Sequence, residues 1–267
     1  MSGGIFFSQK GIKGVREKVY PNFEEAVADI PDGATIMMFC WGIGGTPQNL
    51  IRALYDRGTK NLIIISHNFM PVWIGKHIFS LTDAFTPLTL AKQVKKVITS
   101  FPGTATLGMT SVLEERINKG EVELEIMSHG TFVERVRAGG SGLGGFYTPV
   151  GVGTIVEQGK EKRVIDGKEY IFEKPLHADF GFVRAHKADK RGNLVYRGSV
   201  RATNPIIAMA CDVTIAEVDE IVEVGELDPE VIVTPEIFVH RIVKIPENGL
   251  GSKDHRRTLL RKVFKEG

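Results

Sequence analysis

The hydrophobic pattern of the first 140 residues alternates between short apolar runs and amphipathic segments. Runs that are apolar at many positions are typical of strands buried on both faces, and they predict strands at 34–40, 61–67 and 94–100. The segment 121–128 is expected to be a further strand. Apolar residues at helical spacing predict helices within 22–30, 46–58, 110–120 and 131–139. This order of elements predicts an α/β fold with an open, mostly parallel sheet flanked by helices.

Local signals indicate where some of these helices begin and end. Asn22 is followed three residues later by Glu25, which is the spacing of a capping box. Thr46 is expected to cap the second helix with Pro47 at its first helical position, and Gly58 to end it.

The second half of the chain predicts a β-rich insertion. The segment 137–154, "RAGGSGLGGFYTPVGVGT", has seven glycines but is too apolar for a flexible linker, so it is expected to be an ordered loop. Asp166-Gly167 stands between two short β-like runs and predicts a hairpin. Beyond it, strands are expected on both sides of a turn at 191–193 and at 212–218 and 237–245, with a short helix at 204–211.

Composition narrows the class of protein. The 267 residues include 34 basic and 32 acidic side chains, a net charge of +2, which argues against nucleic-acid binding. Cys40 and Cys211 have no metal-binding or redox spacing, so we expect no metal and a reduced, cytoplasmic setting. No apolar run reaches membrane-spanning length, and we expect neither a signal peptide nor a membrane partner.

The carboxyl ends of the predicted parallel strands mark the candidate binding edge. The residues just after these strands are Phe39 to Gly45, His67 and Asn68, Ser100, and Ser128 to Gly130. The glycine-rich turn at 42–45 precedes a helix whose first amides are expected to be free to bind an anion. It matches neither the dinucleotide nor the P-loop pattern, so a tight turn without a ligand is the alternative.

His67 and His129 each follow an apolar strand and are expected on the same edge. Either histidine could instead be a hydrogen-bonded structural residue. No third ligand stands at metal-binding spacing, and no G-x-S-x-G elbow is present. Glu247 in "PENGLG" is expected to lie in a turn before the basic tail and to have no catalytic role.

Four longer stretches carry a resemblance to a known family. They are "DGATIM…GIGGTPQNLIRAL", "GTFVERVRAGGSGLGGFYTPVGVGT", "ADFGFVRAHKADKRGNLVYR" and "VGELDPEVIVTPEIFVHRIV". Together they resemble the α subunit of family I CoA-transferases, of the acetate/acetoacetate (3-oxoacid) type. The resemblance implies a CoA-transferase fold of the NagB/RpiA-like group, and the division 1–21 as N-terminal extension, 22–245 as CoA-transferase α-subunit domain and 246–267 as basic tail.

The resemblance also implies an enzyme that moves CoA between an acyl-CoA and a short-chain carboxylic or 3-oxo acid. A glutamate of a β subunit forms a glutamyl-CoA thioester, so the nucleophile is expected in the partner and not in this chain. The assembly is expected to be αβ or α2β2, with coenzyme A as a substrate and no permanently bound cofactor.

Site residues follow from the same resemblance. The CoA and oxyanion loop corresponds to Phe39, Cys40, Trp41, Gly42, Ile43, Gly44 and Gly45, and the substrate-facing positions to His67, Asn68 and His129. The family has Gly-Gly-Phe where this chain has Phe39-Cys40-Trp41, an asparagine pair at 67–68 and a glutamine at 129. These departures leave open a changed acyl group, an acyl-CoA hydrolase subunit, or a non-catalytic CoA-binding or scaffolding subunit. A sugar-phosphate isomerase or deaminase of similar fold is disfavoured by the specific middle block.

Overall fold

The computed structural model describes residues 18–39, 45–69, 72–74, 77–79, 88–89, 91–103, 110–247 and 249–250. The strands are β1 (Val19–Tyr20), β2 (Thr35–Met38), β3 (Leu62–Ile65), β4 (Val72–Ile74), β5 (His77–Phe79), β6 (Val94–Thr99), β7 (Glu123–Ile126), β8 (Phe146–Thr148), β9 (Lys162–Ile165), β10 (Lys168–Glu173), β11 (Ala178–Asp189), β12 (Leu194–Val195), β13 (Cys211–Val222) and β14 (Arg241–Lys244). The α-helices are α1 (Phe23–Ala26), α3 (Gln48–Arg57), α5 (Val112–Asn118), α6 (His129–Gly140) and α7 (Asn204–Met209).

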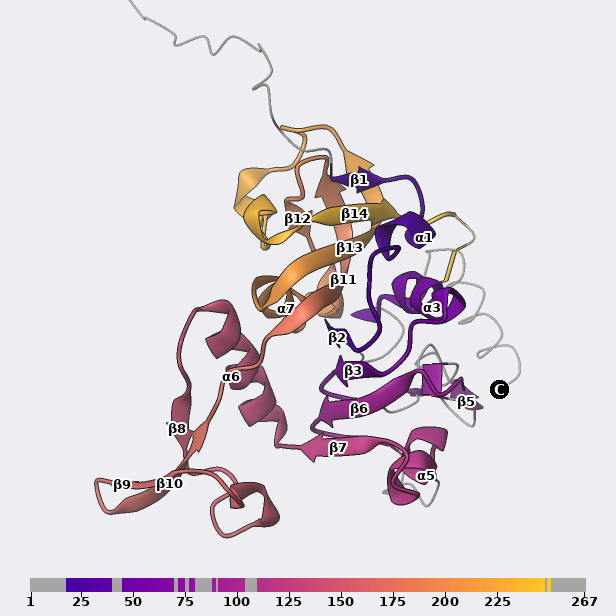
Figure 1. Cartoon of the computed structure of the whole chain (residues 1–267). Coiled ribbons are helices and arrows are strands. Elements are labelled where there is room, and N and C mark those ends of the chain that lie inside the picture. The colour runs from indigo at the N-terminus through magenta and orange to yellow at the C-terminus, as the bar shows by residue number, and fades with distance from the viewer. Residues whose placement is uncertain are drawn as a thin grey trace, which may run out of the picture.

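The main sheet has the strand order β1-β14-β13-β11-β2-β3-β6-β7, with β12 paired to β11 (Figure 1). All neighbours along this order are parallel, and β12 alone pairs antiparallel. The mostly parallel sheet expected from the continuous apolar runs is therefore confirmed. Because β2, β3, β6 and β7 run parallel, their carboxyl ends lie at one edge of the sheet.

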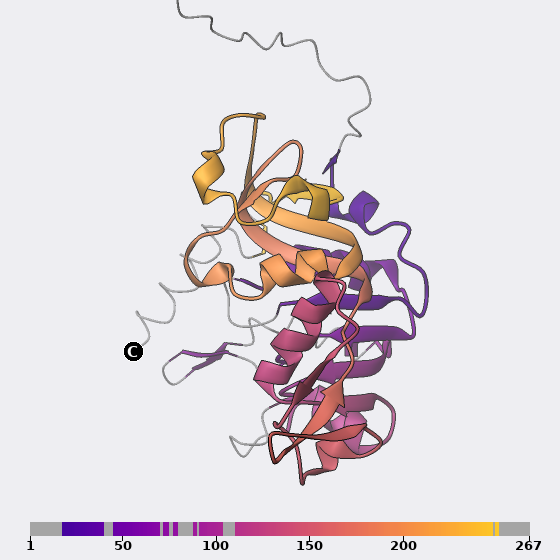
Figure 2. The same ribbon diagram turned by 90° about the vertical axis from the view of Figure 1, so that its left-hand side faces the viewer.

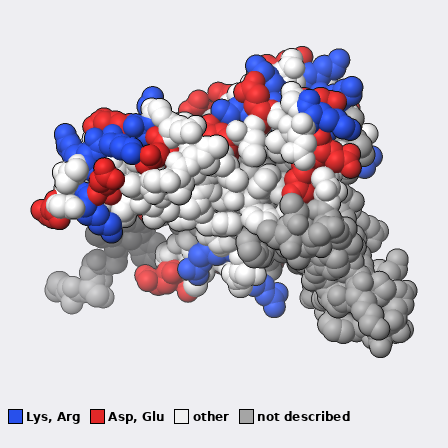
Figure 3. All heavy atoms as spheres, turned by 90° about the horizontal axis from the view of Figure 1, so that it is seen from below, with Lys and Arg blue, Asp and Glu red and all other residues white. Residues whose placement is uncertain are grey.

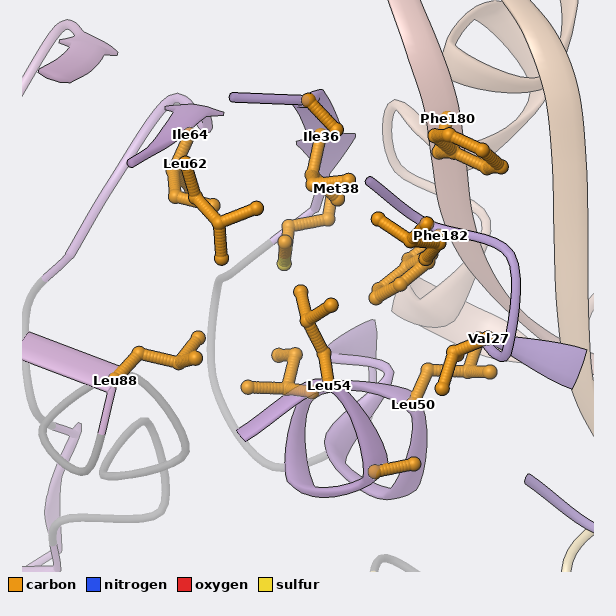
Figure 4. Close-up of a cluster of buried hydrophobic side chains, with 14 of the residues drawn as sticks. Val27, Ile36, Met38, Leu50, Leu54, Leu62, Ile64, Leu88, Phe180 and Phe182 are labelled. Carbon is orange, nitrogen blue, oxygen red and sulfur yellow. The ribbon is translucent and has the colours of Figure 1, made fainter. Parts of the chain in front are cut away.

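Helices cover both faces of the sheet. Leu54 of α3 points toward Met38 of β2 on one face, and Leu50 of the same helix lies beside Val27 (Figure 4); all four side chains are buried. On the other face α6 and α7 lie together in front of the strands (Figure 2). Phe132 of α6 is fully buried there. The side chains of β2 are thus divided between two cores, with Ile36 and Met38 in one and Met37 in the other, as in a strand covered on both faces.

The β-rich insertion expected in the second half is confirmed. Strands β8, β10 and β9 form a separate antiparallel sheet that projects from the body of the molecule (Figure 1). Asp166 and Gly167 join β9 to β10 with φ angles of 50° and 74°. Two consecutive positive φ angles match the twist of a two-residue hairpin, which is why an Asp-Gly pair predicts it.

Some boundaries differ from the sequence prediction. The helix expected from residue 131 begins at His129, because the Ser128 hydroxyl caps it by accepting from the Thr131 amide. The loop expected at 137–154 contains the end of α6 and strand β8. The strand expected at 237–245 begins only at Arg241, since residues 236–238 form a 3-10 helix.

The surface of the described residues shows no field of a single charge sign in the view from below, where basic and acidic side chains alternate around uncharged areas (Figure 3). Among these residues no three His, Cys, Asp or Glu side chains gather closely enough to hold a metal ion. Within the same part of the chain, no helix has the length and apolar character needed to cross a membrane.

Candidate active site

The carboxyl-terminal edge of the sheet brings together three of the side chains singled out in the sequence. The rings of Phe39 and His67 stack with centroids 4.7 Å apart and an interplanar angle of 22°. The His129 ring meets the His67 ring edge-on, with centroids 5.8 Å apart. The parallel pairing of β2, β3, β6 and β7 accounts for this meeting, because each of these residues follows or closely follows a strand end.

The backbone around His67 is tied to the strand beside it. The Ser66 amide donates to the Ile98 carbonyl at 3.1 Å, and the Ser100 hydroxyl donates to the His67 carbonyl at 2.5 Å. The Ser66 hydroxyl donates to the carbonyl of Asn68, whose side chain is buried. These bonds fix the backbone of the turn after β3, and the contacts with the Phe39 and His129 rings position the imidazole of His67.

His67 is buried, with 6% of its surface exposed, and its third ring neighbour is Phe132. Burial among these rings lowers the pKa of His67 to about 4, and the neighbouring His129 lowers this pKa further in the same direction. The imidazole is therefore neutral at pH 7. A neutral imidazole has one hydrogen-bond donor and one acceptor nitrogen, so it suits a polar group without bringing a charge of its own.

The loop between β2 and α3 is described only at its two ends. Residues 40–44, which carry Cys40, Trp41 and three further predicted loop positions, lie outside the described residues. At Gly45 an added Cβ would stand 2.4 Å from Phe39 Cε1, well inside contact distance. The two ends of the loop are thus packed against each other, and a glycine is needed at 45 to make room for the Phe39 ring.

The start of α3 does not offer the free amides expected from the sequence. The Asn49 and Leu50 amides donate to Glu217 Oε2 at 3.0 and 3.1 Å. The Gln48 amide donates to the Thr46 carbonyl, and the Ile51 amide to the Pro47 carbonyl. The prediction that the first amides of this helix are free to bind an anion is therefore wrong. The prediction of Thr46 as the cap is also wrong, since the N-cap is Pro47 and no side chain caps the helix from that position.

Glu217 lies on β13 and belongs to an ionic cluster that was not predicted from the sequence. It is fully buried and forms a cross-strand pair with Arg184 of β11, whose Nε lies 3.6 Å from its Oε1. Burial raises the pKa of Glu217 to about 7, opposed by Arg184 and the helix amides. Asp219 joins Arg184 at 2.6 Å and His186 at 3.1 Å. The signal in the sequence was two pairs of titratable residues two positions apart within apolar strands: Arg184 and His186 on β11, and Glu217 and Asp219 on β13.

Residues near the end of the described chain reach the same helix start. The Asn49 side chain donates to the Leu250 carbonyl at 2.8 Å and accepts from the Leu250 amide at 3.1 Å. Glu247 itself is exposed in a turn that the Gly249 amide closes onto the Pro246 carbonyl. The turn expected at "PENGLG" is present, and its carboxylate faces solvent.

Comparison with known proteins assigns the chain to a family. The model of the family described as Coenzyme A transferase matches residues 20–245. Similar chains include the A subunits of two bacterial CoA-transferases. That of the 3-oxoadipate CoA-transferase of Pseudomonas putida is 44% identical over 85% of this chain and 94% of its own length. That of the succinyl-CoA:3-ketoacid coenzyme A transferase of Helicobacter pylori strain J99 is 40% identical over 85% of this chain and 92% of its own.

The fold agrees with this match. An acyl-CoA transferase of Escherichia coli O157:H7, solved as a thioester complex with CoA, superposes with a TM-score of 0.74 over 88% of this chain and 48% of its own, at 23% identity. The resemblance stated from the four sequence stretches is confirmed. With a family match that spans nearly all of the described sheet, the chain belongs to the coenzyme A transferase family.

Proposed function

We propose that this chain is the α subunit of a heteromeric CoA-transferase that moves CoA between an acyl-CoA and a short-chain carboxylic or 3-oxo acid. The observation that carries the proposal is the coverage of the two bacterial relatives, which match this chain over 92% or more of their own length. Those relatives are named as separate subunits, which supports a separate partner chain here.

In the proposed reaction the nucleophile is a glutamate of the partner β subunit. Its carboxylate oxygen attacks the carbonyl carbon of the acyl-CoA, the C–S bond breaks, and CoA thiolate leaves behind a mixed anhydride. The thiolate then attacks the glutamyl carbonyl, which releases the first acid as a carboxylate and leaves a glutamyl-CoA thioester. The acceptor acid reverses both steps, so the cycle needs no oxidant, reductant or resident cofactor.

Two carboxylates on β13 support a nucleophile from elsewhere. Glu217 is fully buried and accepts two backbone amides, and Asp219 is bound to Arg184 and His186. A nucleophile must be free to form a bond with the substrate. Neither of these described carboxylates meets that requirement.

The role we propose for this chain is to bind and orient the substrates. The loop formed by 39–45 would approach the thioester, where backbone amides suit a developing oxyanion. His67, Asn68 and His129 would face the substrate acid. The stacked pair of Phe39 and His67 supports this assignment, because it places a neutral polar ring beside the end of the loop.

The test is to purify the chain alone and together with the β chain encoded beside its gene. The probes are succinyl-CoA as donor with acetoacetate, 3-oxoadipate and acetate as acceptors. Transfer by the mixture and none by either chain alone supports the proposal, as does a borohydride-sensitive thioester on the partner. Thioester hydrolysis without transfer would favour the hydrolase alternative, and CoA binding without turnover the non-catalytic one.

The domain division is proposed on the same grounds: residues 22–245 as the transferase domain between an N-terminal extension (1–21) and a basic tail (246–267). We propose the cytoplasm as its location, where free cysteines stay reduced.

A further inference from the structure

Both carboxylate oxygens of Glu217 contact groups from other elements of the fold. Its Oε2 accepts from the amides of Asn49 and Leu50, and its Oε1 lies 3.6 Å from Arg184 Nε and 3.3 Å from Asn49 Nδ2. The helix it caps is 167 residues away in sequence. A carboxylate at a helix start satisfies donors that have no partner within the helix and interacts favourably with the helix dipole.

The position of this cap within the sheet is specific. β2 pairs with β11 as far as Met38 and Phe182, and β11 continues past the end of β2. Arg184 therefore lies on the strand beside the point where the chain leaves β2 and enters the loop. The loop starts beside Arg184 and ends just before α3, whose first turn Glu217 holds.

From this geometry we infer that Glu217, held by Arg184, is a positioning residue that fixes the first turn of α3 and with it the end of the loop 39–45. Asn49 extends the same contact to Leu250, which lies beyond the family match that ends at residue 245. The kinetic consequence rests on the proposed function. The structural consequence, the order of the first turn of α3, does not.

The exchange with solvent of the Asn49 and Leu50 amides measures that order directly. At pH 8.5, above the pKa of about 7 of Glu217, the wild-type carboxylate carries its charge. In Glu217→Gln the side chain keeps its size but loses that charge, and its amide group meets the donors of Arg184 and Asn49. Because a hydrogen bond to a charged group is worth more than a neutral one, we expect the two amides to exchange about ten-fold faster or more. In the assembly with the β chain, kcat should fall by about ten-fold or more while KM for succinyl-CoA changes by less than about two-fold.

Glu173→Gln is the matched control, since Glu173 is also buried and ion-paired but lies on β10, in the projecting sheet. It should leave kcat within about two-fold of wild type. Relative to amides in the centre of the main sheet of the same variant, the exchange of the α3 amides should also stay within about two-fold, whatever the change costs in overall stability. Glu217→Asp keeps the charge but is one methylene shorter, and it replaces the glutamine variant if that variant does not fold. With either Glu217 variant, unchanged exchange at Asn49 and Leu50, or faster exchange with unchanged kcat, would overturn the inference.

The two proposals can fail separately. A wild-type assembly that transfers CoA to none of the three acids would contradict the proposed function alone. The exchange comparison between the Glu217 and Glu173 variants would still decide whether Glu217 positions the helix.

Discussion

The imidazole of His67 stacks on the Phe39 ring at 4.7 Å between centroids, so a residue from the end of β3 closes over a residue from the end of β2. Both side chains are more than 90% buried. The stack joins the start of the predicted CoA loop to the predicted substrate-facing turn. A substitution at either residue should therefore change the packing of the other.

The pKa of His67 gives a stability prediction with a definite sign. Its folded pKa is about 4 against 6.5 for the unfolded chain, so the unfolded state binds more protons between these values. The stabilisation is present above pH 6.5 and is lost as the pH falls toward 4. Between pH 7 and pH 5 the free energy of unfolding should fall by about 2 kcal/mol from this group.

The measurement is urea unfolding of the purified chain at pH 7, 6 and 5, beside His67→Asn, which cannot titrate. The free energy of unfolding of the wild type minus that of the variant should fall by about 2 kcal/mol between pH 7 and pH 5. Parallel curves for the wild type and the variant across this range would contradict a buried, neutral His67.

Gly45→Ala should disturb the stack from the other side. The new Cβ would lie 2.4 Å from Phe39 Cε1, so the ring must move away and uncover His67. We expect a loss of about 1–3 kcal/mol in the free energy of unfolding and a rise in the pKa of His67, read by NMR titration. Phe39→Leu removes the clashing atoms, and the double variant should recover part of the loss. If the two substitutions are simply additive, the packing of Gly45 on Phe39 does not matter to stability.

The contrast between what the sequence predicted and what it missed follows from the range of the interactions. The start of α1 at Asn22 and the end of α3 at Gly58 depend on neighbours a few residues away, and both were predicted. The meeting of His67 and His129 was predicted because parallel strands place their carboxyl ends at one edge. Strand β8 was missed because only its pairing with β10 makes it a strand.

The cap of α3 was missed for the same reason. Thr46 stands where a local cap would, but the carboxylate comes from β13, and no local pattern shows that Glu217 lies beneath this helix. A tertiary partner of this kind becomes visible only once the strand order is known.

Arg135→Met should be strongly destabilising. The guanidinium joins α6 to the sheet and the insertion through Glu125 Oε1 at 2.9 Å, the Lys174 carbonyl at 2.7 Å and Glu173 Oε2 at 3.8 Å. Its removal leaves the buried Glu173 with Lys160 as its remaining ionic partner, and breaking a buried pair costs about 3–5 kcal/mol. Arg52→Met, in the exposed pair with Asp56, should change the free energy of unfolding by less than about 1 kcal/mol. Similar losses for the two variants in urea unfolding would contradict this account.

Glu247→Gln should leave the transfer activity of the assembled enzyme nearly unchanged. The side chain is exposed in a turn, and Leu250, three residues on, is held by the side chain of Asn49 and not by Glu247. If the nucleophile is a glutamate of the partner, as proposed, neutralising Glu247 removes no bond that forms in the reaction, and kcat should stay within about two-fold. The assay is succinyl-CoA with the best acceptor acid, beside the glutamine variant of the partner's glutamate, which should lose several orders of magnitude. The same large loss in Glu247→Gln would place the nucleophile in this chain, because only loss of the attacking group removes covalent catalysis altogether.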